Sequence, residues 1–329
     1  MKKKWLIELC AIVLSAALLF ALLAIAGAAA VPFGNGFGAT WGSYRAEEPD
    51  SVDVLFFGSS MVYCDVVPAV VYEESGLRGF VMAGPEQTMP ITYYYVREAL
   101  RTQSPQAVCV EVSGLLFERY GNFTMANLVQ FPWGTNRVGA VLHGARPAEM
   151  TEALFPILAY HERFYSEDLD VLTAQLTPTR DDLAGYTPLR DGTPPDGVEF
   201  RADAGDEAYA AALRWLEKIS DLCRKQGVTL ILYQAPSFRR PSPERQTQLA
   251  ADAAALGDVF WDFNDPARFD ALGTDGADWY DALHFNIRGA GKFSRALAQE
   301  LETLGLRPGG ADDALWQRRL ADFYAEYDP

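Results

Sequence analysis

The stretch from Asp53 to Met61, which reads DVLFFGSSM, constrains the fold more than any other part of the sequence. Its continuous apolar run is typical of a strand buried on both faces of a parallel sheet. Gly58 then permits a sharp turn, because a residue without Cβ tolerates unusual backbone angles. Ser59 and Ser60 should therefore lie at the carboxyl end of the strand, where open α/β sheets place their ligands. A strand followed by a serine helix cap explains the same residues.

Short apolar strands alternate with helical patterns from Asp53 onward, which predicts a parallel sheet covered by helices on both faces. The length allows one large α/β domain or two small ones, and we favour one. Gly76 suits the end of the first helix, because glycine readily adopts left-handed backbone angles. The predicted strands are 52–57, 79–82, 106–112, 228–234 and 259–263, and the predicted helices are 66–75, 89–101, 206–226, 243–256 and 288–304.

The regular alternation is interrupted between about residues 115 and 205, where aromatic residues, prolines and glycines accumulate. We interpret this segment as an insertion over the strand ends, with helices near 148–160 and 167–176. Long excursions of this kind are typical of lids or binding loops, and a disordered loop is the alternative for 181–197. The C-terminal tail, 306–329, contains an amphipathic helical pattern from Asp312 to Tyr327 that places Trp316, Leu320 and Phe323 on one face.

An apolar run from Trp5 to about Val31 follows Lys2, Lys3 and Lys4, and it exceeds the roughly 20 residues that cross a bilayer. It predicts an N-terminal membrane anchor, 1–31, followed by a short linker, 32–50, and an α/β domain, 51–305. The positive-inside rule places everything after the anchor on the outer face of the membrane. A cleavable signal peptide is the alternative, although its apolar region is usually shorter.

The charge and the cysteines exclude several classes of protein. With 44 acidic against 28 basic residues, the net charge of -16 opposes binding to nucleic acid and to anionic lipid surfaces. The four cysteines, at 10, 64, 109 and 223, form neither a disulfide framework nor a zinc motif. Cys64 follows Ser60 by four residues and fits either a reactive thiol or a small buried hydrophobe. The sequence marks no metal site and no glycine-rich nucleotide loop, so we expect no cofactor.

A base for the serine can be sought among only three histidines, His143, His161 and His284. Asp281 precedes His284 by three residues in the stretch DWYDALHFN. Such a loop can hold the carboxylate against one imidazole nitrogen, so that the other nitrogen faces outward as a base. A serine nucleophile requires this help, because a free hydroxyl reacts poorly at neutral pH.

The combination of a strand-terminal Gly-Ser-Ser with a late Asp-x-x-His resembles the SGNH, or GDSL-like, hydrolase superfamily. The resemblance covers about residues 52–304 and is closest to the exported, membrane-anchored branch related to proteins of D-alanyl transfer and alginate O-acetylation. It implies a three-layer, flavodoxin-like parallel sheet. It also implies that Ser60 is the nucleophile, that Ser59 replaces the usual acid of the first motif, and that Asp281 orients His284.

The oxyanion hole departs from the family pattern. The resemblance places a glycine amide donor on Gly84, next to the amide of Ser60. The family's Gly-x-Asn-Asp block should follow the strand that ends at Val112, but Ser113 and Gly114 stand there instead. Gln87 and Ser113 are candidate substitute donors, and losing one such donor costs on the order of 100-fold to 1000-fold in turnover.

Two further residues are candidates for substrate binding, together with Ser59. His161 and Arg163 lie near the end of a predicted helix in the insertion, where they can bind an anionic or sugar substrate above Ser60. The same positions suit basic residues that favour the helix dipole and cap its carbonyls.

We therefore expect an extracytoplasmic serine esterase or O-acyltransferase that acts on O-acyl groups, in particular acetyl, of a cell-envelope glycan or glycopolymer. A membrane protein of acyl transfer is the expected partner. The alternative is a catalytically weakened domain that binds envelope glycans or scaffolds an acylation complex, as the lost Gly-x-Asn-Asp block suggests. Hydrolysis of a lipid ester is a third hypothesis.

Overall fold

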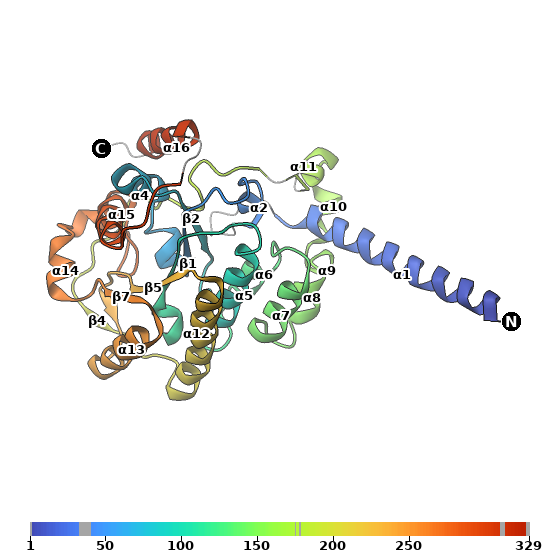
Figure 1. Ribbon diagram of the computed structural model, residues 1–329, viewed down its shortest axis with the longest axis horizontal. Coiled ribbons are helices and arrows are strands. Elements are labelled where there is room, and N and C mark those ends of the chain that lie inside the picture. The colour runs from blue at the N-terminus through green and yellow to red at the C-terminus, as the bar shows by residue number, and fades with distance from the viewer. Residues whose placement is uncertain (1, 33–40, 175, 178, 310–312, 327–329) are drawn as a thin grey trace.

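A five-stranded sheet runs through the centre of the computed structural model, which describes residues 2–32, 41–174, 176–177, 179–309 and 313–326 (Figure 1). Every pairing in this sheet is parallel, and the strand order is β2-β1-β3-β5-β7. The predicted α/β class with a mainly parallel sheet is thus confirmed. The strands are β1 (Val54–Gly58), β2 (Gly79–Ala83), β3 (Ala107–Glu111), β5 (Thr229–Gln234) and β7 (Val259–Asp262).

The sheet is buried on both faces, which explains why β1 is apolar throughout. Leu55 and Phe57 point into one hydrophobic core, whereas Val54 and Phe56 point into a second core on the opposite face. Successive strand residues face opposite sides of a sheet, so a strand between two cores needs apolar side chains at every position.

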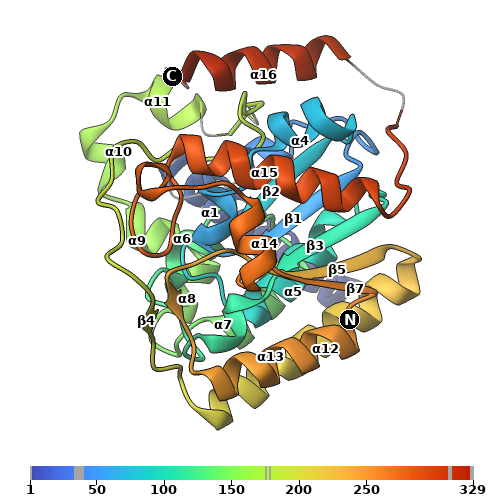
Figure 2. The same ribbon diagram turned by 90° about the vertical axis from the view of Figure 1, so that its left-hand side faces the viewer.

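Helices cover each face (Figure 2). The first core contains side chains of α5 (Met89–Ala99), α7 (Thr135–Gly144), α12 (Asp206–Gln226) and α13 (Pro243–Leu256), and the second contains those of α4 (Pro68–Ser75) and α15 (Ile287–Glu302). The buried residues of α12 recur every three or four positions, as expected for an amphipathic helix. Gly76 and Gly227 end α4 and α12 in left-handed conformations.

Of the two helices predicted in the insertion, the second is present as α11 (Leu169–Ala174), whereas the first is divided in two. Pro156 separates α8 (Met150–Leu154) from α9 (Ile157–Tyr160) where one helix was expected, because proline lacks the N–H that a helix interior requires. Neither α7 nor α14 was predicted. The remaining helices are α1 (Lys2–Ala30), α2 (Trp41–Tyr44), α3 (Ser60–Tyr63), α6 (Thr124–Leu128), α10 (Arg163–Ser166), α14 (Pro266–Ala271) and α16 (Asp313–Glu326), with short η1 (Val112–Leu116) and η2 (Gly276–Asp278).

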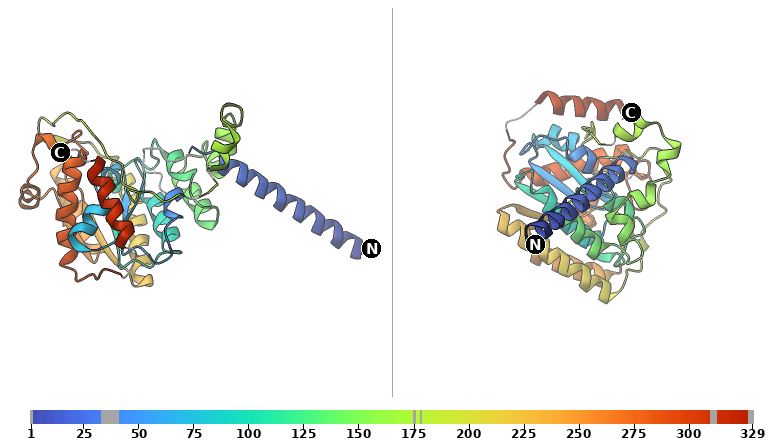
Figure 3. Two further views of the ribbon diagram at one scale, coloured as in Figure 1. Left: turned by 90° about the horizontal axis from the view of Figure 1, so that it is seen from above. Right: turned by 90° about the vertical axis from the view of Figure 1, so that its right-hand side faces the viewer.

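The N-terminal helix α1 projects away from the body of the protein (Figures 1 and 3). Its stretch from Lys4 to Ala30 is long and apolar enough to cross a membrane, a property that signal sequences share. The last residues of α1 are buried against the domain, whereas most of its length is exposed.

The described part of the predicted linker belongs to the domain, so the prediction of a linker there was wrong. Trp41 and Tyr44 are buried in the first core, and the Tyr44 hydroxyl donates to the carbonyl of Ala99 at 3.0 Å. Residues 33–40 of the predicted linker lie outside the described residues. Two large aromatic side chains therefore fix the segment after α1 to the sheet.

Part of the stretch for which a disordered loop was the alternative packs along the open edge of β2. The amide of Val81 donates to the carbonyl of Ala184 at 3.0 Å, and Tyr186 is buried beyond it. The amide of Thr187 donates to the carbonyl of Tyr63 at 2.7 Å. This segment covers a strand edge that would otherwise present unpaired amides.

The predicted C-terminal helix is present as α16, and it packs on the domain. Trp316 and Phe323 are buried, and Trp316 stacks on Tyr72 of α4 with ring centroids 5.4 Å apart. The Arg319 guanidinium pairs with the buried carboxylate of Glu47 at 2.5 Å. The tail is thus an integral part of the domain.

We predict that Trp316→Ala lowers the free energy of unfolding by about 3–5 kcal/mol, because it leaves a cavity under α16. Gln317→Ala, on the exposed side of the same helix, should change it by no more than about 0.5 kcal/mol. Urea unfolding of the full chain in detergent, followed by circular dichroism, measures both. Equal midpoints for the two variants would mean that α16 contributes nothing to the domain.

Candidate functional site

The turn after β1 brings Ser60 to the carboxyl edge of the sheet. Gly58 has a φ of +153°, and a Cβ placed there would lie 2.6 Å from Cγ2 of Val62 and 2.9 Å from Cβ of Glu111. No other residue fits this turn without displacing its neighbours. Ser59 is the N-cap of α3, and Ser60 is the first residue of that helix. The alternative of a serine helix cap therefore fits the position of Ser59, although the Ser59 side chain makes no cap hydrogen bond.

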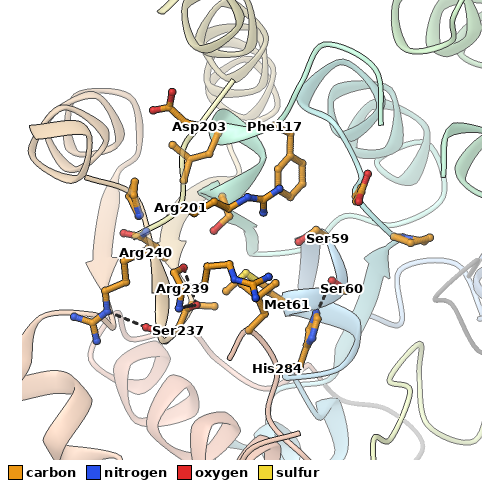
Figure 4. A pocket seen from close by; sticks show the side chains of 18 of the residues that line it. Ser59, Ser60, Met61, Phe117, Arg201, Asp203, Ser237, Arg239, Arg240 and His284 are labelled. Carbon is orange, nitrogen blue, oxygen red and sulfur yellow. Dashed lines mark hydrogen bonds between the residues drawn. The ribbon is translucent and has the colours of Figure 1, made fainter. Parts of the chain in front are cut away.

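Ser60, His284 and Asp281 form a continuous chain of hydrogen bonds. Nε2 of His284 lies 2.8 Å from Oγ of Ser60 (Figure 4). Nδ1 of His284 lies 3.0 Å from Oδ1 of Asp281. The same Oδ1 accepts from the amides of Leu283 and His284 at 2.7 and 2.9 Å. The three residues predicted from sequence are thus brought together, although Ser60 and His284 are 224 positions apart.

The surroundings keep Asp281 ionised. Partial burial raises the pKa of Asp281, but the hydrogen bond and charge of His284 and the two backbone amides outweigh burial and lower the pKa to about 2. A carboxylate can only accept, so Nδ1 of His284 donates to Asp281 and Nε2 is left to accept from the Ser60 hydroxyl. This is the arrangement in which an imidazole can take a proton from serine.

The loop that carries His284 is held in place by contacts of the neighbouring residue Phe285. The amide of Phe285 donates to the buried carboxylate of Asp65 at 2.9 Å. Trp279 pairs with Phe285 in an antiparallel bridge, and their rings lie 4.1 Å apart. The position of the imidazole therefore depends on the segment that follows Ser60 as well as on its own loop.

A cavity of about 310 Å³ opens over Ser60. Its walls come from the turn after β1, the ends of β3 and β5, and the two ends of the insertion. Leu116, Phe117 and Phe123 supply an apolar wall. The insertion thus contributes to the site over Ser60, as expected for a binding loop.

Two arginines that the sequence did not single out point into this cavity. Arg201 and Arg239 extend toward its middle in Figure 4, whereas Arg240 points away and donates to the carbonyl of Ser237 at 2.8 Å. Arg239 pairs with Glu199 at 3.3 Å. The two short parallel strands β4 (Glu199–Phe200) and β6 (Arg239–Arg240) bring them together, and no local pattern reveals such a pairing.

Three of the four predicted oxyanion donors are engaged elsewhere. The amide of Gly84 donates to the carbonyl of Gly58 at 3.3 Å, where it continues the ladder between β1 and β2. The Gln87 side chain donates to Thr92 at 3.1 Å and does not line the cavity. Ser113 lines it, but its amide and hydroxyl both donate to Glu111. The assignment of Gly84, Gln87 and Ser113 as oxyanion donors was therefore wrong.

The amide of Ser60 remains as a donor in the described site. It belongs to the first turn of α3, whose leading N–H groups have no acceptor within the helix. Ser59 also lines the cavity, but it is almost fully buried, and its hydroxyl has no partner among the described residues.

Glu111, at the end of β3, is a second residue that the sequence did not single out. It is fully buried, and it accepts from the hydroxyl of Ser113 at 2.7 Å and from the amide of Ala235 at 3.4 Å. Burial raises its pKa to about 7, against the opposing effect of these hydrogen bonds. The sequence signal that could have identified Glu111 is an acidic residue at the end of an otherwise apolar strand.

The structure places His161 and Arg163 away from Ser60, so their assignment to the substrate site was wrong. Arg163 donates to the carbonyl of Ala30 at 2.9 Å and thereby caps the end of α1. His161 Nδ1 lies 3.2 Å from the carbonyl of Leu158. Neither residue lines the cavity.

Cys64 is buried, which raises the pKa of its thiol and favours the buried hydrophobe over the reactive thiol.

Among the residues that the structure describes, no group of three or more His, Cys, Asp or Glu side chains could hold a metal ion. Comparison of the chain with protein-family models and with curated proteins found no match. The geometry around Ser60 is therefore the basis for a proposal about function.

We predict that Glu111 makes stability depend on pH. Between about pH 4.5 and 7 the unfolded chain ionises this carboxyl, whereas the folded protein keeps it protonated. Its contribution is fully present below that window and is lost as the pH rises through about 7. Relative to Glu111→Gln, the wild type should lose at most about 1.4 kcal/mol per pH unit across the window.

Urea unfolding at several pH values measures this difference, with Glu118→Gln as an exposed control. The wild type and the control should fall together as the pH rises. A gap between wild type and Glu111→Gln that stays constant from pH 4.5 to 7 would contradict the raised pKa.

Proposed function

We propose that this protein is a serine esterase or O-acyltransferase of SGNH type, held by α1 on the outer face of a membrane. Its substrate is an O-acylated, in particular O-acetylated, cell-envelope glycan or glycopolymer. The observation that carries the proposal is the hydrogen-bonded chain from Asp281 through His284 to Ser60, which ends at the floor of a cavity.

In the proposed reaction Oγ of Ser60 attacks the ester carbonyl while Nε2 of His284 takes the hydroxyl proton. The carbonyl oxygen becomes an oxyanion within reach of the Ser60 amide. The ester C–O bond then breaks, and His284 returns the proton to the leaving sugar oxygen. Water or another sugar hydroxyl repeats the sequence on the acyl-enzyme, again with His284 as base. Asp281 holds the imidazole in the required tautomer.

The strand order supports the SGNH assignment. Counted within the large sheet alone, the order is 2-1-3-4-5, which is that of flavodoxin-like sheets. The nucleophile follows the first strand, and the Asp-x-x-His pair precedes α15, as the resemblance implies. The absent Gly-x-Asn-Asp block and the engaged amide of Gly84 are departures from the family pattern.

The cavity wall favours a substrate that is partly apolar and partly anionic. Phe117 and Phe123 suit an acetyl group and the face of a sugar ring. Arg201 and Arg239 suit a carboxylate or phosphate, because a guanidinium donates two parallel hydrogen bonds to such groups. A negatively charged glycopolymer combines these features.

A second candidate function is binding without turnover. The observation that favours it is that three of the four donors predicted for the oxyanion hole, all but the Ser60 amide, are hydrogen-bonded to other groups. In this case Arg201 and Arg239 hold an anionic glycan, and the protein presents it to a membrane acyl-transfer partner.

Fluorophosphonate labelling of the full chain in detergent separates the two functions. We predict that the wild type and Ser59→Ala are labelled and that Ser60→Ala is not. Hydrolysis of an activated acetyl ester should fall about 10⁴-fold or more in Ser60→Ala. Circular dichroism confirms that each variant is folded. If the wild type takes no label and hydrolyses no ester, the esterase proposal fails and the binding function is favoured.

We predict that Arg201→Gln and Arg239→Gln each lower kcat/KM about 10-fold to 100-fold for an acetylated anionic oligosaccharide, since each removes a charged hydrogen bond. The loss should appear mainly in KM and should shrink as salt is added. A neutral acetylated oligosaccharide should be unaffected. Arg224→Gln, on the exposed face of α12, is the matched control. Equal losses on both substrates would argue against an anionic subsite.

A further inference from the structure

The domain contacts the membrane helix well before that helix ends. The ring of Phe20 packs edge-on against Trp133 at 4.9 Å and against Phe155 at 6.3 Å. Phe20 precedes Ala30 by ten residues, which is about 15 Å along an α-helix. The contact with α1 is therefore a lateral one, more than two turns below the point where the chain enters the domain.

The length of α1 places this contact at the membrane. The 27 residues from Lys4 to Ala30 extend about 40 Å, whereas the hydrocarbon core of a bilayer is about 30 Å thick. Phe20 lies about 24 Å beyond Lys4 along the helix. With Lys4 at the inner boundary, Phe20 lies below the outer boundary of the hydrocarbon, and a tilt of α1 places it deeper. Trp133 and Phe155 then reach the outer bilayer interface.

Exposed apolar side chains surround the same end of α1. They lie on α9, α10 and α11, which flank the base of α1 in Figures 1 and 3. Tyr165 is 89% exposed and Leu169 is 72% exposed, although an isolated soluble domain gains nothing from exposing them. We define the membrane face as Trp133, Phe155, Leu158, Phe164, Tyr165 and Leu169, all of which are exposed or partly exposed.

We infer that the membrane face inserts into the outer interface of the bilayer that α1 spans, so that the domain is seated on the lipid. Tryptophan and tyrosine are the residues typical of this depth, because their rings are apolar and their N–H and O–H groups remain hydrated. Glu162, Glu167 and Asp168 lie in the same segment and oppose anionic headgroups. The apolar contact, rather than charge, drives the seating, and a zwitterionic lipid suffices.

This inference is independent of the proposed chemistry at Ser60, and it requires that α1 is retained. A domain seated on the lipid differs in one measurable way from a domain that α1 merely tethers to the membrane. A tethered domain exposes Tyr165 to water, whereas a seated domain exposes it to lipid.

The test uses the full chain in phosphatidylcholine nanodiscs with Cys10→Ser. Cys64, Cys109 and Cys223 are buried and do not compete for a thiol-reactive dye. An environment-sensitive fluorophore is attached at Tyr165→Cys, and separately at Leu158→Cys. The matched control is Ala254→Cys, an exposed position on α13.

Emission at positions 165 and 158 should shift to the blue relative to position 254. Phosphatidylcholine that carries a nitroxide high on its acyl chain should quench both positions and leave 254 unchanged. Quenching at both positions equal to that at 254 would overturn the inference. A blue shift without lipid quenching would also overturn it, since the face would then be covered by protein, such as a second copy of the chain.

Discussion

The hydrogen bond from the amide of Phe285 to the carboxylate of Asp65 joins the two halves of the site. Asp65 follows Ser60 by five residues, and Phe285 follows His284 directly, so the bond ties the serine turn to the histidine loop. Asp65 is completely buried, and burial raises its pKa well above the usual range. The distance between the serine hydroxyl and the imidazole therefore depends on a polar contact that solvent does not reach.

The residues that could be predicted from sequence are those whose pattern lies within a short segment or whose residue type is rare in the chain. Asp281 and His284 are three positions apart, and only three histidines compete as the base. The strands and the long helices were predictable for the same reason, because their apolar spacing lies within the segment itself. The tail helix, with Trp316 and Phe323 on its buried face, is another example.

Apart from the Ser60 amide, the oxyanion donors could not be predicted, because their availability is decided by acceptors elsewhere in the fold. The amide of Gly84 meets the carbonyl of Gly58, and Ser113 meets a buried glutamate at the end of its own strand. Arg163 was predicted to lie at a helix end, and it does cap one, but the carbonyl belongs to Ala30 of α1. Arg201 and Arg239 converge through a pairing of two short strands that no local pattern encodes.

The contact between Glu47 and Arg319 has a consequence for how the chain is made. Glu47 lies shortly after α1 and Arg319 lies in α16, so the pair joins two segments that are 272 positions apart in the sequence. As the chain leaves the ribosome, Glu47 emerges long before Arg319, so its buried carboxylate lacks its guanidinium partner until α16 has been made. The part of the domain that holds this ion pair is therefore expected to pack only after α16 has been made, so the pair forms late in folding.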